Sequence, residues 1–116
     1  MKILLGSLLL LFALNTALCG QMKADTTGCG WRDLAPAQFK KLLADSVVTL
    51  IDVRTSAEYH AGHIEGARNI DVRKPDFDKQ ITGLKADRPV AVYCKGGVRS
   101  RVAARKLVQK GFRVYN

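Results

Sequence analysis

Two nearly continuous apolar runs constrain the fold of this chain more than any other feature. The first is "VVTLIDV" at residues 47–53, and the second, at residues 89–94, is contained in "RPVAVYC". Neither alternates between apolar and polar residues, as a strand with one wet face would. Continuous runs of this kind are typical of strands buried on both faces of a parallel sheet. Parallel strands need crossover connections, which are usually helices. The two runs therefore predict an α/β domain with a mainly parallel sheet.

The segments around these runs carry helical patterns, so that helices and strands alternate. In "DLAPAQFKKLLAD", Pro36 suits a first helical turn. In "TSAEYHAGH", Thr55 or Ser56 can cap a helix that Gly62 ends. We expect helices at residues 36–44, from Thr55 or Ser56 to Gly62, weakly within 76–84, and at 100–110, with further strands near 67–71 and from 112 onward. In the last helix we expect Val102, Ala103, Leu107 and Val108 to face inward, and Arg101, Arg105, Lys106 and Lys110 to face outward.

The length and charge of the chain limit what it can be. Its 116 residues allow one domain, and its 47% hydrophobic and 25% charged residues suit a globular protein. The formal net charge is +9, but the basic residues are scattered and alternate with acidic ones. We therefore expect a basic solvated surface and no nucleic-acid partner.

The first twenty residues differ in composition from the rest. "MKILLGSLLLLFALNTALCG" has an early Lys, an apolar stretch and then small residues, which is the layout of a secretory signal peptide. We expect a signal peptide at 1–20, a polar linker at 21–31, a domain at 32–116 and export, with a periplasmic location. Two alternatives stay open: an uncleaved N-terminal anchor, and a lipoprotein attached to the membrane through Cys19. Without lipidation we expect no membrane association.

The candidate reactive group is Cys94, at the point where the second apolar run gives way to a helix. A free thiol has a pKa of about 8.5, so it holds little thiolate at neutral pH. A helix N-terminus carries about half a positive charge and unpaired N–H groups, which favour the thiolate. Gly96 and Gly97 allow a curled backbone whose N–H groups point inward around the sulfur. Lys95 and Arg99 add positive charge, so the segment predicts an activated nucleophile beside a receptor for a small anion.

A second interpretation of Cys94 is a buried cysteine at a strand end, followed by an ordinary glycine turn. A disulfide between Cys94 and Cys29 is a further alternative, since an exported protein meets an oxidising compartment. It would block the nucleophile. The two glycines and two arginines in "CKGGVRSR" favour the reactive interpretation.

Two longer segments extend this interpretation to a family. "LIDVRTSAEYHAGHIEGARNIDV" and "VYCKGGVRSRVAARKLVQKGF" together span most of residues 47–113, and they resemble the single-domain rhodaneses, the thiosulfate sulfurtransferases. With the apparent export signal, the chain is most similar to the small periplasmic rhodaneses of the phage-shock type. The resemblance implies a three-layer α/β fold. It also implies a last helix beyond "FRVYN", so we expect the domain to be incomplete at its C-terminal end.

The resemblance implies a reaction as well. The thiolate of Cys94 would take sulfane sulfur from thiosulfate or a similar anionic donor and pass it to a thiol or cyanide acceptor through a persulfide. The segment that would bind the donor comprises Lys95, Gly96, Gly97, Val98, Arg99 and Ser100. The residues that would support this loop are Asp52, Arg54 and Glu58, with His63 and Asn69 also matching the family motif. No cofactor and no metal are expected, and oligomeric state is left open.

Two other functions stay open at this point. One is a non-catalytic module of the same fold that carries sulfur or binds a partner. The other is a phosphatase or arsenate reductase of the same fold, whose loop places five residues between Cys and Arg. Here four residues separate Cys94 from Arg99, and Ser100 occupies the position of the phosphatase arginine. The shorter loop favours sulfur transfer.

Overall fold

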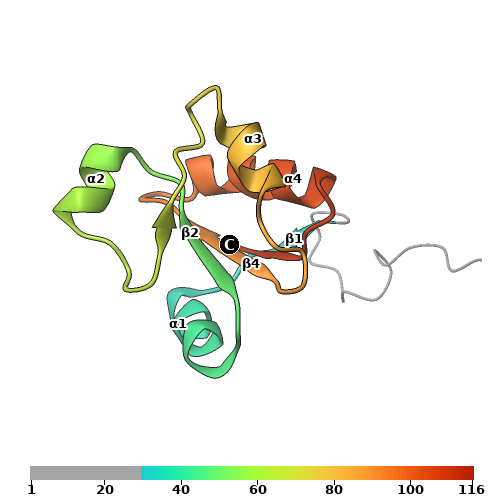
Figure 1. Ribbon diagram of the computed structural model, residues 1–116. Helices are drawn as coiled ribbons and strands as arrows, with labels where there is room; N and C mark the ends of the chain where they lie inside the picture. The colour runs from blue at the N-terminus through green and yellow to red at the C-terminus, as the bar shows by residue number, and fades with distance from the viewer. Residues whose placement is uncertain (1–29) are drawn as a thin grey trace, which may run out of the picture.

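Residues 30–116 are described by a computed structural model in which a five-stranded sheet lies between helices on its two faces (Figure 1). The predicted signal peptide, nearly all of the predicted linker, Cys19 and Cys29 lie outside the described residues. The strands are β1 (Trp31–Arg32), β2 (Thr49–Asp52), β3 (Arg68–Asn69), β4 (Val90–Tyr93) and β5 (Val114–Tyr115). The helices are α1 (Pro36–Asp45), α2 (Ser56–Ala61), α3 (Phe77–Thr82) and α4 (Val98–Gln109).

The sheet has the strand order β1-β5-β4-β2-β3, and every neighbouring pair runs parallel. The two predicted apolar runs form β2 and β4, which lie side by side with Ile51 opposite Val92. This confirms the α/β class and the parallel sheet. Because parallel strands end at the same edge, Asp52 and Cys94 meet at one edge, where ligands usually bind in such folds.

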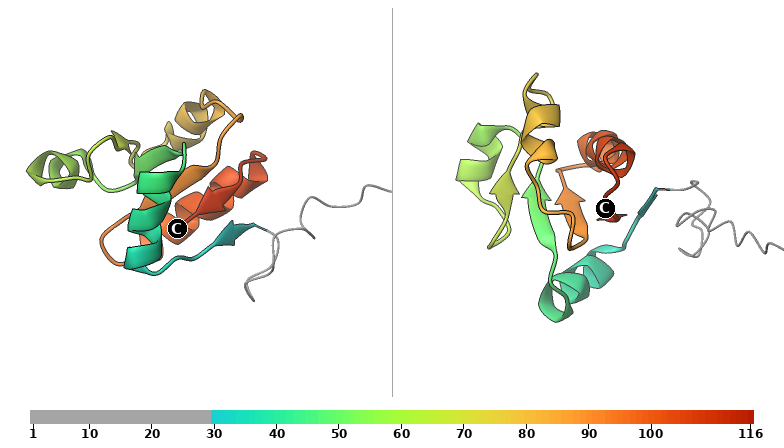
Figure 2. Two further views of the ribbon diagram at one scale, coloured as in Figure 1. Left: turned by 90° about the horizontal axis from the view of Figure 1, so that it is seen from below. Right: turned by 45° about the vertical axis from the view of Figure 1, so that its right-hand side comes forward.

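The two faces of the sheet take alternate residues of each strand. Ile51 and Val92 face one side and pack in a cluster with α3 and α4, including Ile81 and Leu107. Leu50 and Ala91 face the other side, where the partly buried apolar side chains of α1 cover them. Figure 2 shows α1 on one face and α3 and α4 on the other, which confirms the three-layer arrangement.

Several expected boundaries differ from those observed. Helix α4 begins at Val98, two residues before the expected start, because the chain turns at Gly97. Strand β2 begins at Thr49, and Val47 is 71% exposed ahead of it. Strand β3 is shorter than expected. Strand β1 pairs with β5, and its two residues lie where we expected the linker to end and the domain to begin.

The predicted inward face of α4 is partly wrong. Ala103 and Leu107 are fully buried and Val108 is partly buried, but Val102 is 41% exposed. Ala104, which was not among the residues expected to face inward, is fully buried. The helix is therefore rotated so that two consecutive alanines contact the sheet closely. Small side chains permit that approach.

Across the part of the chain that the structure describes, no helix combines the length and apolar character that a membrane crossing needs.

Candidate active site

Cys94 lies directly after β4, and three residues separate it from the first residue of α4. Gly97 occupies the N-cap position of α4 with φ of +91°, in the left-handed region that favours glycine. Gly96 has no such backbone requirement, and a Cβ added to either glycine would meet no atom within 4 Å. The local fold therefore depends on glycine at position 97. It turns the chain so that the first N–H groups of α4 face back toward the sulfur.

The sulfur of Cys94 is surrounded by hydrogen-bonding groups from this turn. The backbone N–H of Gly97 donates to Sγ at 3.0 Å, and that of Ser100 donates to it at 3.3 Å. The thiol donates to Oγ of Ser100 at 3.4 Å, and the Ser100 hydroxyl donates to the carbonyl of Gly97 at 3.1 Å. A hydroxyl can rotate to donate to a thiolate, so each of these groups can stabilise negative charge on sulfur.

These contacts set the acidity of Cys94. Partial burial by itself raises the pKa of the thiol, but the hydrogen bonds from the Ser100 side chain and from the backbone N–H groups of Ser100, Gly97 and Gly96 outweigh burial. The net result is a pKa below the ordinary thiol value. The N-terminus of the 12-residue helix α4 acts in the same direction.

Arg99 points away from solvent toward Glu58 on α2. Its guanidinium donates to both carboxylate oxygens of Glu58, at 2.7 and 2.9 Å. Glu58 also accepts from the N–H and the hydroxyl of Thr55, which caps α2. The hydrogen bond from Arg99 is the main reason that the pKa of Glu58 lies far below its usual value. This pairing balances the charge of Arg99.

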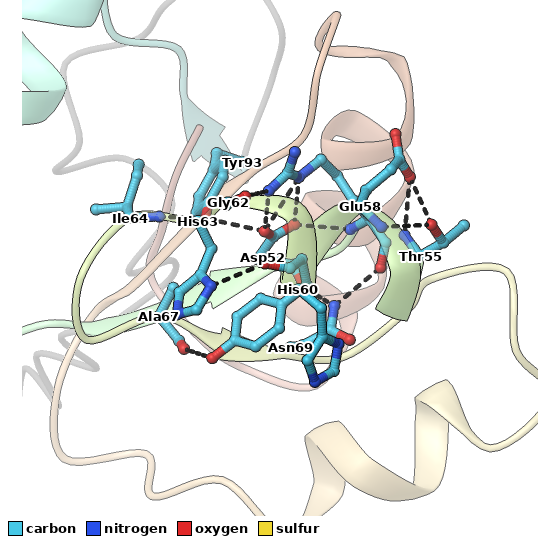
Figure 3. Close-up of polar contacts among 12 residues, drawn as sticks. Asp52, Thr55, Glu58, His60, Gly62, His63, Ile64, Ala67, Asn69 and Tyr93 are labelled. Carbon is cyan, nitrogen blue, oxygen red and sulfur yellow. Dashed lines mark hydrogen bonds and ion pairs between the residues drawn. The ribbon is translucent and has the colours of Figure 1, made fainter.

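A second polar network lies beside the first, at the end of β2 (Figure 3). The buried carboxylate of Asp52 accepts from the backbone N–H and the guanidinium of Arg54 at 2.7–3.0 Å. Tyr93 donates its hydroxyl proton to Asp52 at 2.9 Å, and the same hydroxyl accepts from the N–H of Ile64 at 3.0 Å. Arg54 also donates to the carbonyl of Gly62 at 2.7 Å. The network therefore ties the 62–64 turn to the strand that ends in Cys94.

The structure divides the predicted site residues into two groups. Gly96, Gly97 and Ser100 contribute hydrogen bonds to Sγ, whereas Lys95 and Val98 are exposed beside it. Asp52 pairs with Arg54, and Glu58 pairs with Arg99, in the surroundings of the loop. Asn69 lies there as well, and its side chain donates to the carbonyls of Asp52 and Arg54.

The two histidines take structural positions. His63 stacks on the ring of Tyr59 with centroids 3.7 Å apart, and its Nδ1 contacts the carbonyl of Tyr59 at 2.8 Å. His60 is exposed, and its Nδ1 contacts the carbonyl of Ser56 at 2.7 Å. Neither histidine is hydrogen-bonded to Cys94.

Sequence reasoning missed two residues that shape the site. Tyr93 precedes Cys94 and alternates with the buried valines of β4, so its side chain had to emerge on the opposite face from Val92. The sequence shows that alternation, but it does not show that Asp52 is the hydrogen-bond partner of Tyr93. Thr55 was recognised as a helix cap, but its contact with the carboxylate that binds Arg99 was not foreseen.

Two features bear on alternative chemistries. Within residues 30–116, Cys94 is a free thiol. The same residues contain no group of three or more His, Cys, Asp or Glu side chains placed to hold a metal ion. The two backbone N–H groups that donate to Sγ at the start of α4 suit a thiolate nucleophile.

Known proteins resemble this chain in sequence or in fold. A tRNA uridine(34) hydroxylase from Staphylococcus aureus (strain JH9) is 35% identical over 83 residues, which are 68% of this chain and 26% of that protein. The chain thus spans about a quarter of the length of the curated relatives it matches. A rhodanese-like domain protein from Staphylococcus aureus superposes with a TM-score of 0.65 at 26% identity, covering 73% of this chain and 82% of the other.

A rhodanese with anions from E. coli superposes with a TM-score of 0.51 at 29% identity, covering 60% of this chain and 84% of the other. The profile of the rhodanese-like domain family matches residues 35–116, which include every strand and helix from α1 onward. The chain therefore belongs to the rhodanese-like domain family.

Proposed function

We propose that this protein is a sulfurtransferase that moves sulfane sulfur from thiosulfate, or a similar small anionic donor, to a thiophilic acceptor. The observation that carries the proposal is the set of hydrogen bonds on Cys94: two backbone N–H groups at the start of α4 donate to its sulfur at 3.0 and 3.3 Å. Membership of the rhodanese-like family supports the same chemistry.

The reaction has two half-steps. In the first, the Cys94 thiolate attacks the outer sulfur of thiosulfate, a new S–S bond forms, and the S–S bond of the donor breaks with its electron pair leaving on sulfite. In the second, a thiolate or cyanide attacks the outer sulfur of the Cys94 persulfide, and Cys94 leaves as a thiolate. The N–H groups around Sγ stabilise negative charge on the resting thiolate and on the persulfide. Neither half-step needs a cofactor.

Mass spectrometry of the intact protein after thiosulfate treatment tests the proposal. We expect one added sulfur atom on Cys94, removed again by cyanide. Cys94→Ser should gain none, while Cys29→Ser should behave as the unmodified protein does. Wild-type turnover in the Cys94→Ser protein would rule out the assignment. Sulfur loading on Cys94 without turnover would instead support the sulfur-carrier alternative.

Phosphatase or arsenate reductase activity is disfavoured by the loop. Four residues separate Cys94 from Arg99, and Arg99 is held by Glu58. Ser100, one position later, uses its N–H and hydroxyl on the sulfur. We expect negligible hydrolysis of aryl phosphates. Inserting one glycine between Gly97 and Val98 gives the phosphatase spacing and should depress sulfur transfer. Robust aryl phosphate hydrolysis by the unmodified chain, lost in Cys94→Ser, would favour the phosphatase.

The proposal also covers the molecular partners and the cellular location of the protein. We propose a small anionic sulfur donor, a thiol or cyanide acceptor, no nucleic-acid partner and export through the segment at 1–20. The hydroxylase activity named for the relatives belongs to proteins of which this chain matches about a quarter. N-terminal sequencing of protein from the cell envelope should find a start near Cys19 to Gln21. Full-length soluble protein in the cytoplasm would contradict export.

A further inference from the structure

The side of α4 that points away from the sheet carries apolar side chains beside the reactive loop. Helix α4 packs on the face of the sheet opposite α1 (Figure 2). Val98 and Val102 lie one turn apart on its outer side, where they are 74% and 41% exposed. Arg105 and Gln109 continue the same side of the helix and are exposed too. Apolar residues scattered singly on a surface are ordinary, whereas these two valines are neighbours.

The chain from Cys94 onward is strongly basic. Residues 94–116 contain seven Lys and Arg residues and neither Asp nor Glu. Lys95 and Arg105 are exposed, and no carboxylate among residues 30–116 forms an ion pair with either. Positive charge that no ion pair neutralises therefore flanks the two valines. Three of the other basic residues are paired with carboxylates from other elements, in the pairs Arg99–Glu58, Arg101–Asp33 and Lys106–Asp78.

Lys95, Val98, Val102 and Arg105 form a surface that we call the α4 face, and this face is continuous with the reactive site. Lys95 directly follows Cys94, and Val98 directly follows the glycine whose N–H donates to Sγ. Arg105 lies seven positions after Val98. The face therefore extends about 10 Å along α4. Cyanide or a small thiol at the sulfur does not span that distance, but a protein that brings a thiol to Cys94 does.

We propose that the α4 face binds a protein that carries the sulfur acceptor as a cysteine thiol flanked by acidic and apolar side chains. The inference rests on the sulfur-transfer function proposed above. Acidic side chains on the acceptor complement Lys95 and Arg105, and such complementarity speeds association and selects among partners. Apolar side chains on the acceptor complement Val98 and Val102, which would leave water on binding.

Sulfur transfer to such a protein is an exchange of thiolates. The acceptor thiolate attacks the outer sulfur of the Cys94 persulfide, and a new S–S bond forms on the acceptor. The bond between Sγ and the outer sulfur breaks, and its electron pair stays on Sγ as the thiolate. The N–H groups of Gly97 and Ser100 stabilise that leaving thiolate. The outer sulfur keeps its proton, so atoms and charges balance with no oxidant, reductant or cofactor.

Three synthetic acceptor peptides test the charge that the face selects. Each has one central cysteine with about six residues on either side, enough when extended to reach past Arg105. The arms alternate leucine with Glu, with Gln or with Lys. The measured quantity is kcat/KM for sulfur transfer from the Cys94 persulfide, divided by the rate at which neutral iodoacetamide alkylates the same peptide. That division cancels differences in intrinsic thiol reactivity.

The Glu peptide should be the best acceptor and the Lys peptide the worst. The difference should shrink as ionic strength rises from about 0.02 M to about 0.5 M, because salt screens exposed charges. Arg105→Gln should lower the value for the Glu peptide about two- to fivefold. Val102→Gln should lower the values for the Glu and Gln peptides alike. Neither variant should change turnover with thiosulfate and 2-mercaptoethanol, since neither residue donates to Sγ.

Two matched controls make the same changes away from the face. Lys85→Gln removes one positive charge at an exposed residue ahead of β4, and Val47→Gln replaces a 71% exposed valine ahead of β2. Both residues precede their strands, so they lie at the opposite edge of the sheet from Cys94. Each control should leave all three peptides unaffected.

The outcomes separate this inference from the proposed function. Absence of a Cys94 persulfide after thiosulfate treatment would refute sulfur transfer itself. Normal turnover with 2-mercaptoethanol but no preference among the peptides would refute only the docking proposal. A preference that Lys85→Gln reduces as much as Arg105→Gln would also refute it, because the field of the whole protein would then be the cause.

Two further measurements assign the face to other occupants if the proposal is wrong. In fluorescence anisotropy, an RNA oligonucleotide could bind more tightly than the Glu peptide and lose that affinity in Arg105→Gln. In analytical ultracentrifugation, the chain could form dimers that Val102→Gln dissociates. The first result would assign the α4 face to nucleic acid and the second to another copy of the chain, and either would overturn the proposal.

Discussion

Ser100 makes more contacts with the reactive sulfur than any other residue described here. It is only 1% exposed, and both its N–H and its hydroxyl reach Sγ of Cys94. Its hydroxyl is the largest of the hydrogen-bond contributions that lower the pKa of the thiol. A buried hydroxyl with partners on both sides is costly to replace, because its removal leaves the carbonyl of Gly97 without that donor.

The pH dependence of Cys94 alkylation tests the role of Ser100. The hydrogen bonds on Sγ hold the pKa of Cys94 below that of an ordinary thiol, so alkylation by iodoacetamide should rise with pH through a lower midpoint than that of an unstructured cysteine peptide. Ser100→Ala should move the midpoint upward, because one stabilising bond to the thiolate is lost. A background with Cys19→Ser and Cys29→Ser leaves Cys94 as the one thiol of the chain. Val98→Ala, a change at a 74% exposed residue, serves as the control. An unchanged midpoint in Ser100→Ala would contradict the role of the hydroxyl.

Glu58 connects α2 to the first turn of α4, and its contribution to stability should depend on pH. Its folded-state pKa lies below the unfolded value of about 4.3, so its contribution is present above that pH and is lost as pH falls toward the folded value. Glu58→Gln should therefore lower the urea midpoint near pH 7, and should lower it less at about pH 3.

A matched change at another carboxylate serves as the control for Glu58. Asp87 pairs with Arg88 at 3.4 Å on the surface, where both side chains are exposed. Asp87→Asn should shift the urea midpoint little at either pH, because exposed ion pairs contribute little. If Glu58→Gln and Asp87→Asn behaved alike, the Glu58–Arg99 pair would have no special structural role.

At the scale of elements, the site is the junction between β4 and α4. The strand delivers Cys94 to the edge of the sheet, and the turn at Gly97 reverses the chain so that the helix N-terminus faces the sulfur. The helix in turn is fixed against the sheet by Ala103 and Ala104, both fully buried. The N–H donors to the sulfur are backbone groups, so the turn and the helix determine their positions.

The two glycines of the loop provide a matched pair of variants. Gly97 has φ of +91°, so Gly97→Ala forces an L-residue into the left-handed region at a cost of about 1–2 kcal/mol. It should also weaken the N–H bond to Sγ and lower sulfur transfer several-fold. Gly96→Ala has open space and no positive φ, so it should change stability by less than about 0.5 kcal/mol. Chemical denaturation and initial rates of both variants test this difference. Equal losses in the two variants would contradict it.

At the scale of the whole molecule, the sheet separates two apolar layers that differ in how fully their side chains are buried. The layer of α3 and α4 contains most of the fully buried side chains, whereas the α1 layer has few buried residues and many partly buried ones. Stability should therefore depend mainly on the α3–α4 layer.

Truncations on α4 test this division. Leu107 is fully buried in the α3–α4 layer, so Leu107→Ala should cost about 2–5 kcal/mol through lost burial and the cavity left behind. Val102 is 41% exposed on the same helix, so Val102→Ala should change stability by less than about 0.5 kcal/mol. Urea denaturation measures both. A large loss of stability in Val102→Ala would instead support the orientation of α4 that the sequence predicted.

The sequence predicted the class of fold and the position of Cys94 between a strand and a helix because both depend on local patterns. Two continuous apolar runs are stable only when buried on both faces, and they became the adjacent strands β2 and β4. Cys94 followed by glycines and a helical pattern is a local arrangement as well. The start of α4 was predicted two residues late, since the sequence does not show where a glycine adopts positive φ.

Only the tertiary structure decided which distant residues meet. Arg99 pairs with Glu58 and Tyr93 with Asp52, and each pair is separated by 41 positions in the chain. Such pairs depend on the strand order and on how each crossover helix lies on the sheet, and no local pattern encodes either. The sequence by itself determined that Cys94 lies between a buried strand and a helix, and the packing of separate elements around it determined the neighbours of Arg99 and of Tyr93.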